Sequence, residues 1–285
     1  MPGSMPEFRP PYVPPLGIQY PENPGAHVKS LRIYDGRDLL IAGAKEIDLV
    51  MDENYPFWDR SPAFKFKNML IYLGIFSLVF ILSPLRFGLK IEGRPILRKY
   101  RDILKNGAMT ASNHVHRWDL LFVLQAVRFR RLFLPVWYRN LETAGRGLIR
   151  SIGGIPIPSQ SHLMPAFMRA LQDLHSAKKW IHVYPESSNW LYYQPIRPFK
   201  KGVFTIAWDN NIPVLPLAIS WRPAKGIFKL FKKNFPLVTV RIGEPVMPDK
   251  TRSRREAVQI LRKQTHAKIV ELAGIRDNPW PAEGD

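Results

Sequence analysis

From residue 89 onward, short apolar runs alternate with longer segments whose apolar residues recur every three or four positions. The short runs indicate buried strands, and the longer spacing indicates helices. We predict strands at 89–93, 108–112, 132–137, 155–157, 180–184, 213–221 and 237–242, and helices at 94–105, 120–126, 140–151, 162–177, 202–209 and 253–273. Strands that alternate with helices predict an α/β fold with a mixed, mostly parallel sheet flanked by helices.

The N-terminal part of the chain has a different composition. Residues 1–27 contain eight prolines, a density that neither a helix nor an inner strand tolerates, so we expect an extended arm. Residues 28–66 are mixed and polar, and they either form a small strand pair or lie along a membrane surface. We therefore divide the chain into an N-terminal extension (1–66), an apolar segment (67–88), an α/β domain (89–275) and a tail (276–285).

The apolar segment has no charged residue between positions 68 and 85, and lysines and arginines flank it on both sides. A helix needs about 20 apolar residues to cross the hydrocarbon core, with a lower limit of roughly 17. Because Pro84 is expected to end the helix, three alternatives stay open: a short transmembrane span, an interfacial anchor and a buried core helix. Basic residues at both ends favour an anchor whose two ends return to one anionic face.

The net charge is +19, from 42 basic and 23 acidic residues, and this imbalance predicts an anionic partner. Residues 225–235 interleave lysines with isoleucine, leucine and phenylalanine, a pattern typical of a membrane surface. Together with the apolar segment, this favours an anionic membrane over nucleic acid, and we expect no nucleic-acid partner. The chain has no cysteine, which excludes disulfides, thiolate zinc sites and cysteine nucleophiles.

The stretch from 110 to 126 holds the strongest candidate for chemistry. His114 and Asp119 are separated by four residues and lie between a predicted strand and a predicted helix. Asp119 would lie in the first helical turn, where the helix dipole favours a carboxylate. If that carboxylate accepts a hydrogen bond from one imidazole nitrogen, the other nitrogen is left unprotonated, as a general base requires. A surface histidine near a helix-start aspartate would give the same spacing by chance.

Three further blocks follow in order. Residues 151–160 form a glycine turn leading into a short strand, residues 183–190 place Glu186 at the end of a strand, and residues 211–220 are a proline-interrupted apolar strand. With the Asn-His-x4-Asp block at 113–119 and the Phe-Lys-Lys-Gly run at 199–202, this ordered set resembles the glycerolipid acyltransferases. The resemblance covers roughly residues 85–250.

The resemblance implies an O-acyltransferase of phospholipid biosynthesis that needs no cofactor. His114 would be the general base on an acceptor hydroxyl, and Asp119 would orient its ring. Substrate binding falls to Asn113, Glu186 and Ser187. The donor would be an acyl-CoA or acyl-ACP thioester, and the acceptor a lysophospholipid such as 1-acylglycerol-3-phosphate. The enzyme would be membrane-associated on the cytoplasmic face, either monotopic or with a single short span.

The sequence departs from this family at two places. The second block lacks the arginine that usually binds the acceptor phosphate, and the third continues Ser187-Ser188-Asn189 in place of Gly-Thr-Arg. Either other cations bind the phosphate or the acceptor is a different lipid. Lysine suffices as a point charge, so Lys200 and Lys201 are candidate replacements, as are Arg150 and Arg169, which flank the second block.

Two alternatives to this function stay open. One is a non-catalytic, basic membrane- or nucleic-acid-binding protein that keeps the fold after losing part of the site. The other is a metal-dependent hydrolase, because His114 and His116 form a pair that could begin a metal site with a nearby carboxylate. No compact cluster of further ligands follows in the sequence, and we expect no metal.

Overall fold

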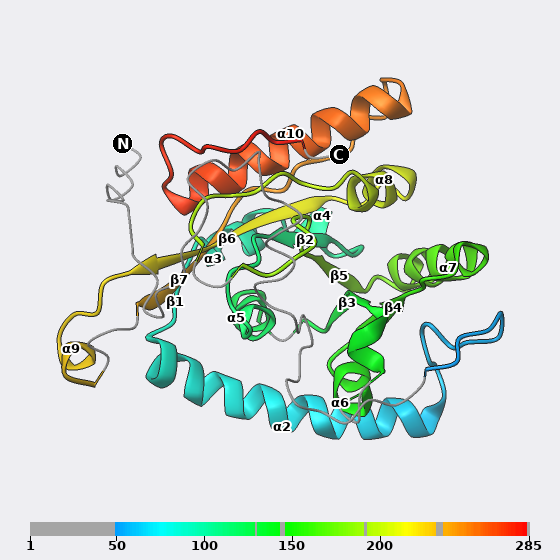
Figure 1. Cartoon of the computed structure of the whole chain (residues 1–285), viewed down its shortest axis with the longest axis horizontal. Coiled ribbons are helices and arrows are strands. Elements are labelled where there is room, and N and C mark those ends of the chain that lie inside the picture. Colours follow the sequence, from blue (N-terminus) through cyan, green and yellow to red (C-terminus); the bar gives the residue numbers. More distant parts are fainter. Residues whose placement is uncertain (1–48, 129, 143–145, 191–192, 232–235, 284–285) are drawn as a thin grey trace.

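The structure, a computed structural model, describes residues 49–128, 130–142, 146–190, 193–231 and 236–283 (Figure 1). The proline-rich arm predicted for 1–27, and most of the extension predicted to follow it, lie outside the described residues.

The described chain forms one sheet with helices on both faces (Figure 1). The sheet has seven strands in the order β1-β7-β6-β2-β5-β3-β4, and every neighbouring pair is parallel except β6 and β7. The predicted fold class is therefore confirmed. The strands are β1 (Lys90–Glu92), β2 (Met109–Ser112), β3 (Leu132–Trp137), β4 (Gly154–Ile157), β5 (Trp180–Val183), β6 (Val214–Arg222) and β7 (Leu237–Ile242).

The helices differ from the prediction mainly at their boundaries. The segment 94–105 is two short helices, which meet at Tyr100, and the segment 140–151 is a 3-10 turn followed by a helix. The helical elements are α2 (Pro62–Phe87), α3 (Arg94–Lys99), α4 (Arg101–Leu104), α5 (Asp119–Ala126), η1 (Tyr138–Leu141), α6 (Arg146–Ser151), η2 (Ser161–Leu163), α7 (Met164–Ser176), α8 (Gly202–Asp209), α9 (Ile227–Phe231) and α10 (Arg254–Ala273).

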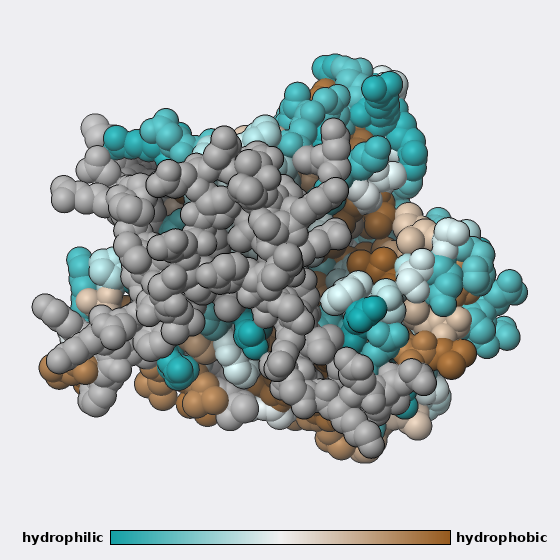
Figure 2. All heavy atoms as spheres, viewed as in Figure 1, coloured by the Kyte–Doolittle hydropathy of each residue, from teal (hydrophilic) through white to brown (hydrophobic). Residues whose placement is uncertain are grey.

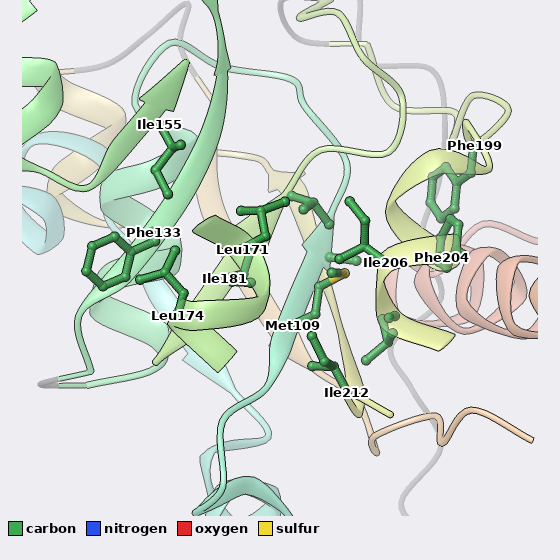
Figure 3. Close-up of a cluster of buried hydrophobic side chains, with 14 of the residues drawn as sticks. Met109, Phe133, Ile155, Leu171, Leu174, Ile181, Phe199, Phe204, Ile206 and Ile212 are labelled. Atoms are coloured by element: carbon green, nitrogen blue, oxygen red, sulfur yellow. The ribbon is translucent and has the colours of Figure 1, made fainter. Parts of the chain in front are cut away.

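Two apolar clusters cover the two faces of the sheet, because side chains alternate between faces along each strand. In β6, Val214 and Ala218 belong to the cluster under α7, α8 and α10, whereas Leu215 and Leu217 belong to the cluster under α3, α4 and α5. Figure 3 shows the first cluster, in which β2 and β5 side chains meet those of α7 and α8. Both faces of the central strands are buried, as a mostly parallel sheet requires.

The apolar segment is longer and more exposed than a core helix. Helix α2 is capped at its N-terminus by Ser61, whose hydroxyl accepts a hydrogen bond from the Phe64 N–H. At its C-terminus it is capped by Gly88, which adopts the left-handed conformation. The expectation that Pro84 ends the helix is wrong: the helix continues to Phe87. Only 12% of its most apolar 18-residue window is buried within the described chain, which argues against the core-helix alternative.

Helix α2 lies along one side of the domain, against α5 and α6 (Figure 1). The Tyr72 hydroxyl donates a hydrogen bond to the Arg130 carbonyl at 3.1 Å, and Asn68 and Ser83 are buried against the domain. The opposite side exposes large apolar side chains, namely Phe66, Met69, Leu70, Leu73, Phe80, Ile81, Leu82 and Leu85. The helix is long and apolar enough to cross a membrane, yet it packs sideways on the domain.

Candidate active site

The parallel pairing of β2 with β5 brings His114 and Glu186 together. Thr110 pairs with His182, and the same register continued past the strand ends places His114 opposite Glu186. The backbone N–H of His114 donates to Glu186 Oε2 at 3.0 Å. Both residues therefore lie at the carboxyl edge of two central strands, where open α/β sheets bind ligands.

His114 and Asp119 make the hydrogen bond that their spacing predicted. His114 Nδ1 lies 2.9 Å from Asp119 Oδ2, and the same oxygen accepts the backbone N–H groups of Val115 (2.7 Å) and His116 (2.8 Å). Since an ionised carboxylate only accepts, Nδ1 carries the proton and Nε2 is left with its lone pair. The Asp119 carboxylate is fully buried, whereas the His114 side chain is 19% exposed. The pair can thus present a base to a bound molecule.

The half-buried ring of Tyr184 packs on the His114 ring, and the buried ring of His182 packs on Tyr184. The ring of Tyr184 stacks on the imidazole with the centroids 3.9 Å apart and an interplanar angle of 11°. His182 packs edge-on against Tyr184 at 4.5 Å, and its Nδ1 lies 2.9 Å from the Thr110 hydroxyl. Burial lowers the pKa of His182 to about 3 and raises the pKa of Tyr184 well above its ordinary value, so both groups stay neutral at neutral pH.

Glu186 is not open to solvent, because it is paired with Arg197. Arg197 Nη2 lies 2.8 Å from Glu186 Oε2, the Arg197 backbone N–H donates to Glu186 Oε1 at 2.9 Å, and both side chains are almost fully buried. The guanidinium also donates to the Ser188 hydroxyl at 2.7 Å and lies over the Trp190 ring at 4.3 Å. Arg197 was missed in the sequence because no block contains it and its partner, Glu186, lies eleven positions earlier in the chain.

The tail of the chain secures this loop. The Asn278 amide nitrogen donates to the Ile196 carbonyl at 2.8 Å, and the Ile196 N–H donates to Asn278 Oδ1 at 2.9 Å. The Trp280 indole N–H donates to the Tyr193 hydroxyl at 2.7 Å, and its ring packs edge-on against Trp190. The tail predicted as a separate segment therefore packs on the loop that carries Arg197.

The amide of Asn113 binds the backbone of the neighbouring strand. Its nitrogen donates to the Ile219 carbonyl, and its oxygen accepts the Ile219 N–H, both at 2.8 Å. Asn113 is 1% exposed. This arrangement fixes the start of the His114 loop against β6, and substrate binding by Asn113 stays a prediction.

The remaining predicted binding residues lie in different surroundings. Ser187 is exposed and adopts a left-handed backbone conformation (φ 69°), which a glycine in the same position would adopt without strain. Lys200 and Lys201 are exposed, and the Lys200 N–H donates to the Pro185 carbonyl at 2.8 Å, directly beside Glu186. Arg150 instead ties α6 to the segment before α2, donating to the carbonyls of Pro56 (2.5 Å) and Phe57 (3.3 Å).

His116, the second half of the possible metal-binding pair, is enclosed by aromatic rings. Phe87, Phe122 and Trp221 surround it with centroids within 5.8 Å, and its Nδ1 accepts the Trp118 N–H at 3.1 Å. Burial lowers the pKa of His116. Among the residues that the structure describes, no group of three or more histidine, aspartate and glutamate side chains is placed to hold a metal ion.

Comparison with known proteins places this geometry in a family. Residues 89–220 match the family model described as Acyltransferase. This part of the chain is an acyltransferase-family domain. The match confirms the acyltransferase part of the prediction for these residues, which include His114, Asp119, Glu186 and Arg197.

Among solved structures, one similar to this chain over three quarters of its length is an acyltransferase. It is the 1-acyl-sn-glycerophosphate (LPA) acyltransferase PlsC from Thermotoga maritima, with a TM-score of 0.46 and 21% sequence identity over 75% of this chain and 84% of that chain. No curated protein matches the sequence.

Proposed function

We propose that the protein is a membrane-associated glycerolipid acyltransferase that moves a fatty acyl group from an acyl-CoA or acyl-ACP thioester to a lysophospholipid hydroxyl. The observation that carries this proposal is the His114 Nδ1–Asp119 Oδ2 hydrogen bond of 2.9 Å at the carboxyl edge of the acyltransferase domain. The hydrogen bond holds the His114 ring in the tautomer that leaves Nε2 unprotonated, as a general base requires.

His114 Nε2 takes the proton of the acceptor hydroxyl as the oxygen attacks the thioester carbonyl. The tetrahedral intermediate then collapses, the carbon–sulfur bond breaks, and the imidazolium returns the proton to the departing thiolate. Asp119 stabilises the imidazolium in between, because its fully buried carboxylate accepts a hydrogen bond from the Nδ1–H group. The products are an ester and a free thiol, and the enzyme ends in its starting protonation state.

We assign Glu186 a positioning role. Its carboxylate already accepts the His114 backbone N–H and is paired with Arg197, so it fixes the place from which the His114 side chain projects. Lys200 and Lys201 are then the candidate contacts for the acceptor phosphate, because both are exposed and the Lys200 backbone is bonded to Pro185 beside Glu186. Arg150 is less suited, since its guanidinium donates to backbone carbonyls of residues 56 and 57.

The membrane contact is assigned to the exposed side of α2. A helix of 26 residues is about 39 Å long, enough to span a hydrocarbon core of about 30 Å. A perpendicular span would, however, break the contacts of Tyr72, Asn68 and Ser83 with the domain. We therefore favour a monotopic arrangement in which α2 lies in the interface, on the cytoplasmic face where thioester donors are available.

The test measures free-thiol release from acyl-CoA or acyl-ACP with a panel of lysophospholipid acceptors. His114→Ala is compared with wild type and with His162→Ala, a matched control at an exposed histidine. We expect a loss of roughly 10²–10⁴-fold in kcat for the first variant only. Equal turnover of wild type and His114→Ala would rule out the proposed base, and no turnover by wild type with any acceptor would favour the non-catalytic alternative.

A further inference from the structure

The connection between β6 and β7 forms a projection that the proposed function does not use. It contains the short helix α9, and both of its ends meet the C-terminal end of α2. Arg222, at the end of β6, donates a hydrogen bond to the Gly88 carbonyl, and Leu237, at the start of β7, packs so closely that a Cβ on Gly88 would lie 2.8 Å from its Cδ2. The base of the projection is therefore fixed to the end of α2.

The described part of this projection is apolar and exposed. Ile227 is 65% exposed and Leu230 is 73% exposed, among the highest values for large apolar side chains of the described chain. In Figure 1, α9 lies beyond the left-hand end of α2, and Figure 2 shows hydrophobic atoms both over α9 and along the lower edge over α2. Nothing in the described chain covers these side chains.

The last turns of α2 and the loop after His114 extend this apolar surface. Ile81 and Leu85 in α2 are 60% and 66% exposed. Trp118, the residue directly before Asp119, is 51% exposed, and its ring lies 6.3 Å from that of Phe87 at the end of α2. We call the set formed by α9, the last two turns of α2 and Trp118 the apolar rim. It reaches from the membrane helix to the catalytic loop.

The charges around the apolar rim have one sign. Residues 222–235 include five lysines and arginines and no acidic residue, and the last two turns of α2 add Arg86 and no acidic residue. Lysines and arginines near an anionic bilayer are attracted to its headgroups, and apolar side chains between them enter the acyl boundary. A surface that binds single-stranded nucleic acid would instead offer several aromatic rings for base stacking. Among the described residues of the apolar rim, Trp118 is the one exposed ring, and the exposed residues of α9, Ile227 and Leu230, are aliphatic.

We propose that α9 is a second membrane contact and that its occupant is an anionic lipid bilayer. A single helix lying in the interface leaves the domain free to rotate about the helix axis. A second contact, offset from that axis, removes this freedom and brings Trp118 and the His114 loop to the lipid surface. The inference rests on the proposed function, since it identifies the surface from which a lipid acceptor would reach His114.

The test is flotation of the full chain with vesicles of phosphatidylglycerol and phosphatidylcholine, and with vesicles of phosphatidylcholine alone. The double variant Ile227→Asp/Leu230→Asp is compared with wild type and with Ile103→Asp/Met247→Asp, a control at exposed apolar residues outside the apolar rim. We expect a loss of roughly tenfold or more in binding to anionic vesicles for the α9 variant, and little change for the control. Wild type should bind the anionic vesicles more tightly than the neutral ones.

A second readout separates this proposal from the proposed function. Turnover of an acceptor embedded in vesicles should fall in the α9 variant, whereas turnover of a short-chain, water-soluble acceptor should match wild type. Vesicle binding needs no catalysis, so it tests α9 even if wild type transfers no acyl group. Equal binding of wild type and the α9 variant would overturn the proposal, as would binding of single-stranded RNA by a wild type that ignores vesicles.

Discussion

The two loops that carry the proposed catalytic site (113–119 and 186–197, called the catalytic loops below) bury charged side chains, whereas the apolar rim exposes apolar ones. At the catalytic loops, Asp119, Glu186 and Arg197 are charged and at most 6% exposed. At the apolar rim, Ile227 and Leu230 are apolar and more than 60% exposed. Buried charges and clustered exposed apolar side chains are both uncommon in soluble domains, and each is informative where it occurs.

The two regions differ in what holds them. Each buried charge has a partner that the fold supplies, such as the pair of backbone N–H groups on Asp119 Oδ2 or the guanidinium on Glu186. The exposed apolar side chains have no such partner in the described chain. A change at the catalytic loops should therefore affect catalysis and folding, whereas a change at the apolar rim should affect binding to membranes alone.

The largest effect is expected for Asp119→Asn. The neutral amide stabilises the imidazolium less than the carboxylate does, and with its oxygen at the Oδ2 position its NH₂ group is buried at the Oδ1 position, where the described chain offers no partner. If the amide is turned over, its NH₂ group faces three donors, so neither orientation reproduces the contacts of Asp119. We expect kcat to fall roughly 10³–10⁴-fold, with little change in KM, measured by free-thiol release. A rise in KM with kcat unchanged would show that Asp119 acts on substrate binding and not on the base.

The next largest effect is expected for Arg197→Met. The substitution leaves the Glu186 carboxylate buried without its ion-pair partner, and breaking a buried pair in this way costs about 3–5 kcal/mol of folding free energy. Urea unfolding of the full chain measures this cost. The double variant Glu186→Gln/Arg197→Met removes both charges and should recover most of the stability without recovering the activity.

An exposed ion pair provides the control for that experiment. Lys99 and Glu244 lie 2.6 Å apart with side chains more than half exposed. Lys99→Met should therefore cost much less folding free energy than Arg197→Met, because solvent screens the pair. Equal losses of folding free energy for Lys99→Met and Arg197→Met would show that the buried Glu186–Arg197 pair matters no more for folding than an exposed pair.

A smaller, pH-dependent effect is expected from His182. Burial lowers its folded-state pKa to about 3, while the unfolded chain takes up the proton near 6.5. The unfolded state therefore binds one more proton between these values, so the stability present above pH 6.5 is lost as the pH falls, by about 1.4 kcal/mol per pH unit.

The measurement is urea unfolding at pH 7 and pH 5 for wild type, His182→Gln and the exposed control His162→Gln. Between these pH values, wild type and His162→Gln should lose about 2 kcal/mol more than His182→Gln. The other buried histidines contribute equally to all three proteins. Parallel pH curves for wild type and His182→Gln would contradict the neutral, buried state assigned to His182.

The sequence predicted those parts of the molecule that depend on local patterns. The strand and helix order follows from apolar periodicity, and the His114–Asp119 hydrogen bond follows from a spacing of five residues across one strand–helix junction. Helix boundaries were less predictable: Pro84 lies inside α2 although proline usually ends a helix. Proline removes only the hydrogen bond of its own missing N–H, and the helix continues past Pro84 to Phe87.

The parts that could not be predicted depend on contacts between distant segments. Glu186 reaches the His114 backbone only because β2 and β5 pair in one particular register. Arg197 reaches Glu186 through a loop that the tail residues Asn278 and Trp280 hold in place. No pattern within 186–200 encodes this arrangement, since its determinants lie some eighty residues away along the chain.

The smallest effect on folding is expected at the exposed side of α2, where substitutions should change membrane binding and leave the folded domain intact. In Ile81→Lys/Leu85→Lys, both residues are at least 60% exposed, so neither substitution removes packing. Lysine is also a good helix former, so the free energy of unfolding should change by no more than about 0.5 kcal/mol for each site. Phe122→Ala, at a fully buried ring of α5, should cost about 3–5 kcal/mol by comparison.

The same lysine variant should bind anionic vesicles less tightly, because two apolar side chains no longer enter the acyl boundary. Large destabilisation by the lysines would mean that this side of α2 is packed against protein, and the membrane assignment of the apolar rim would then fail.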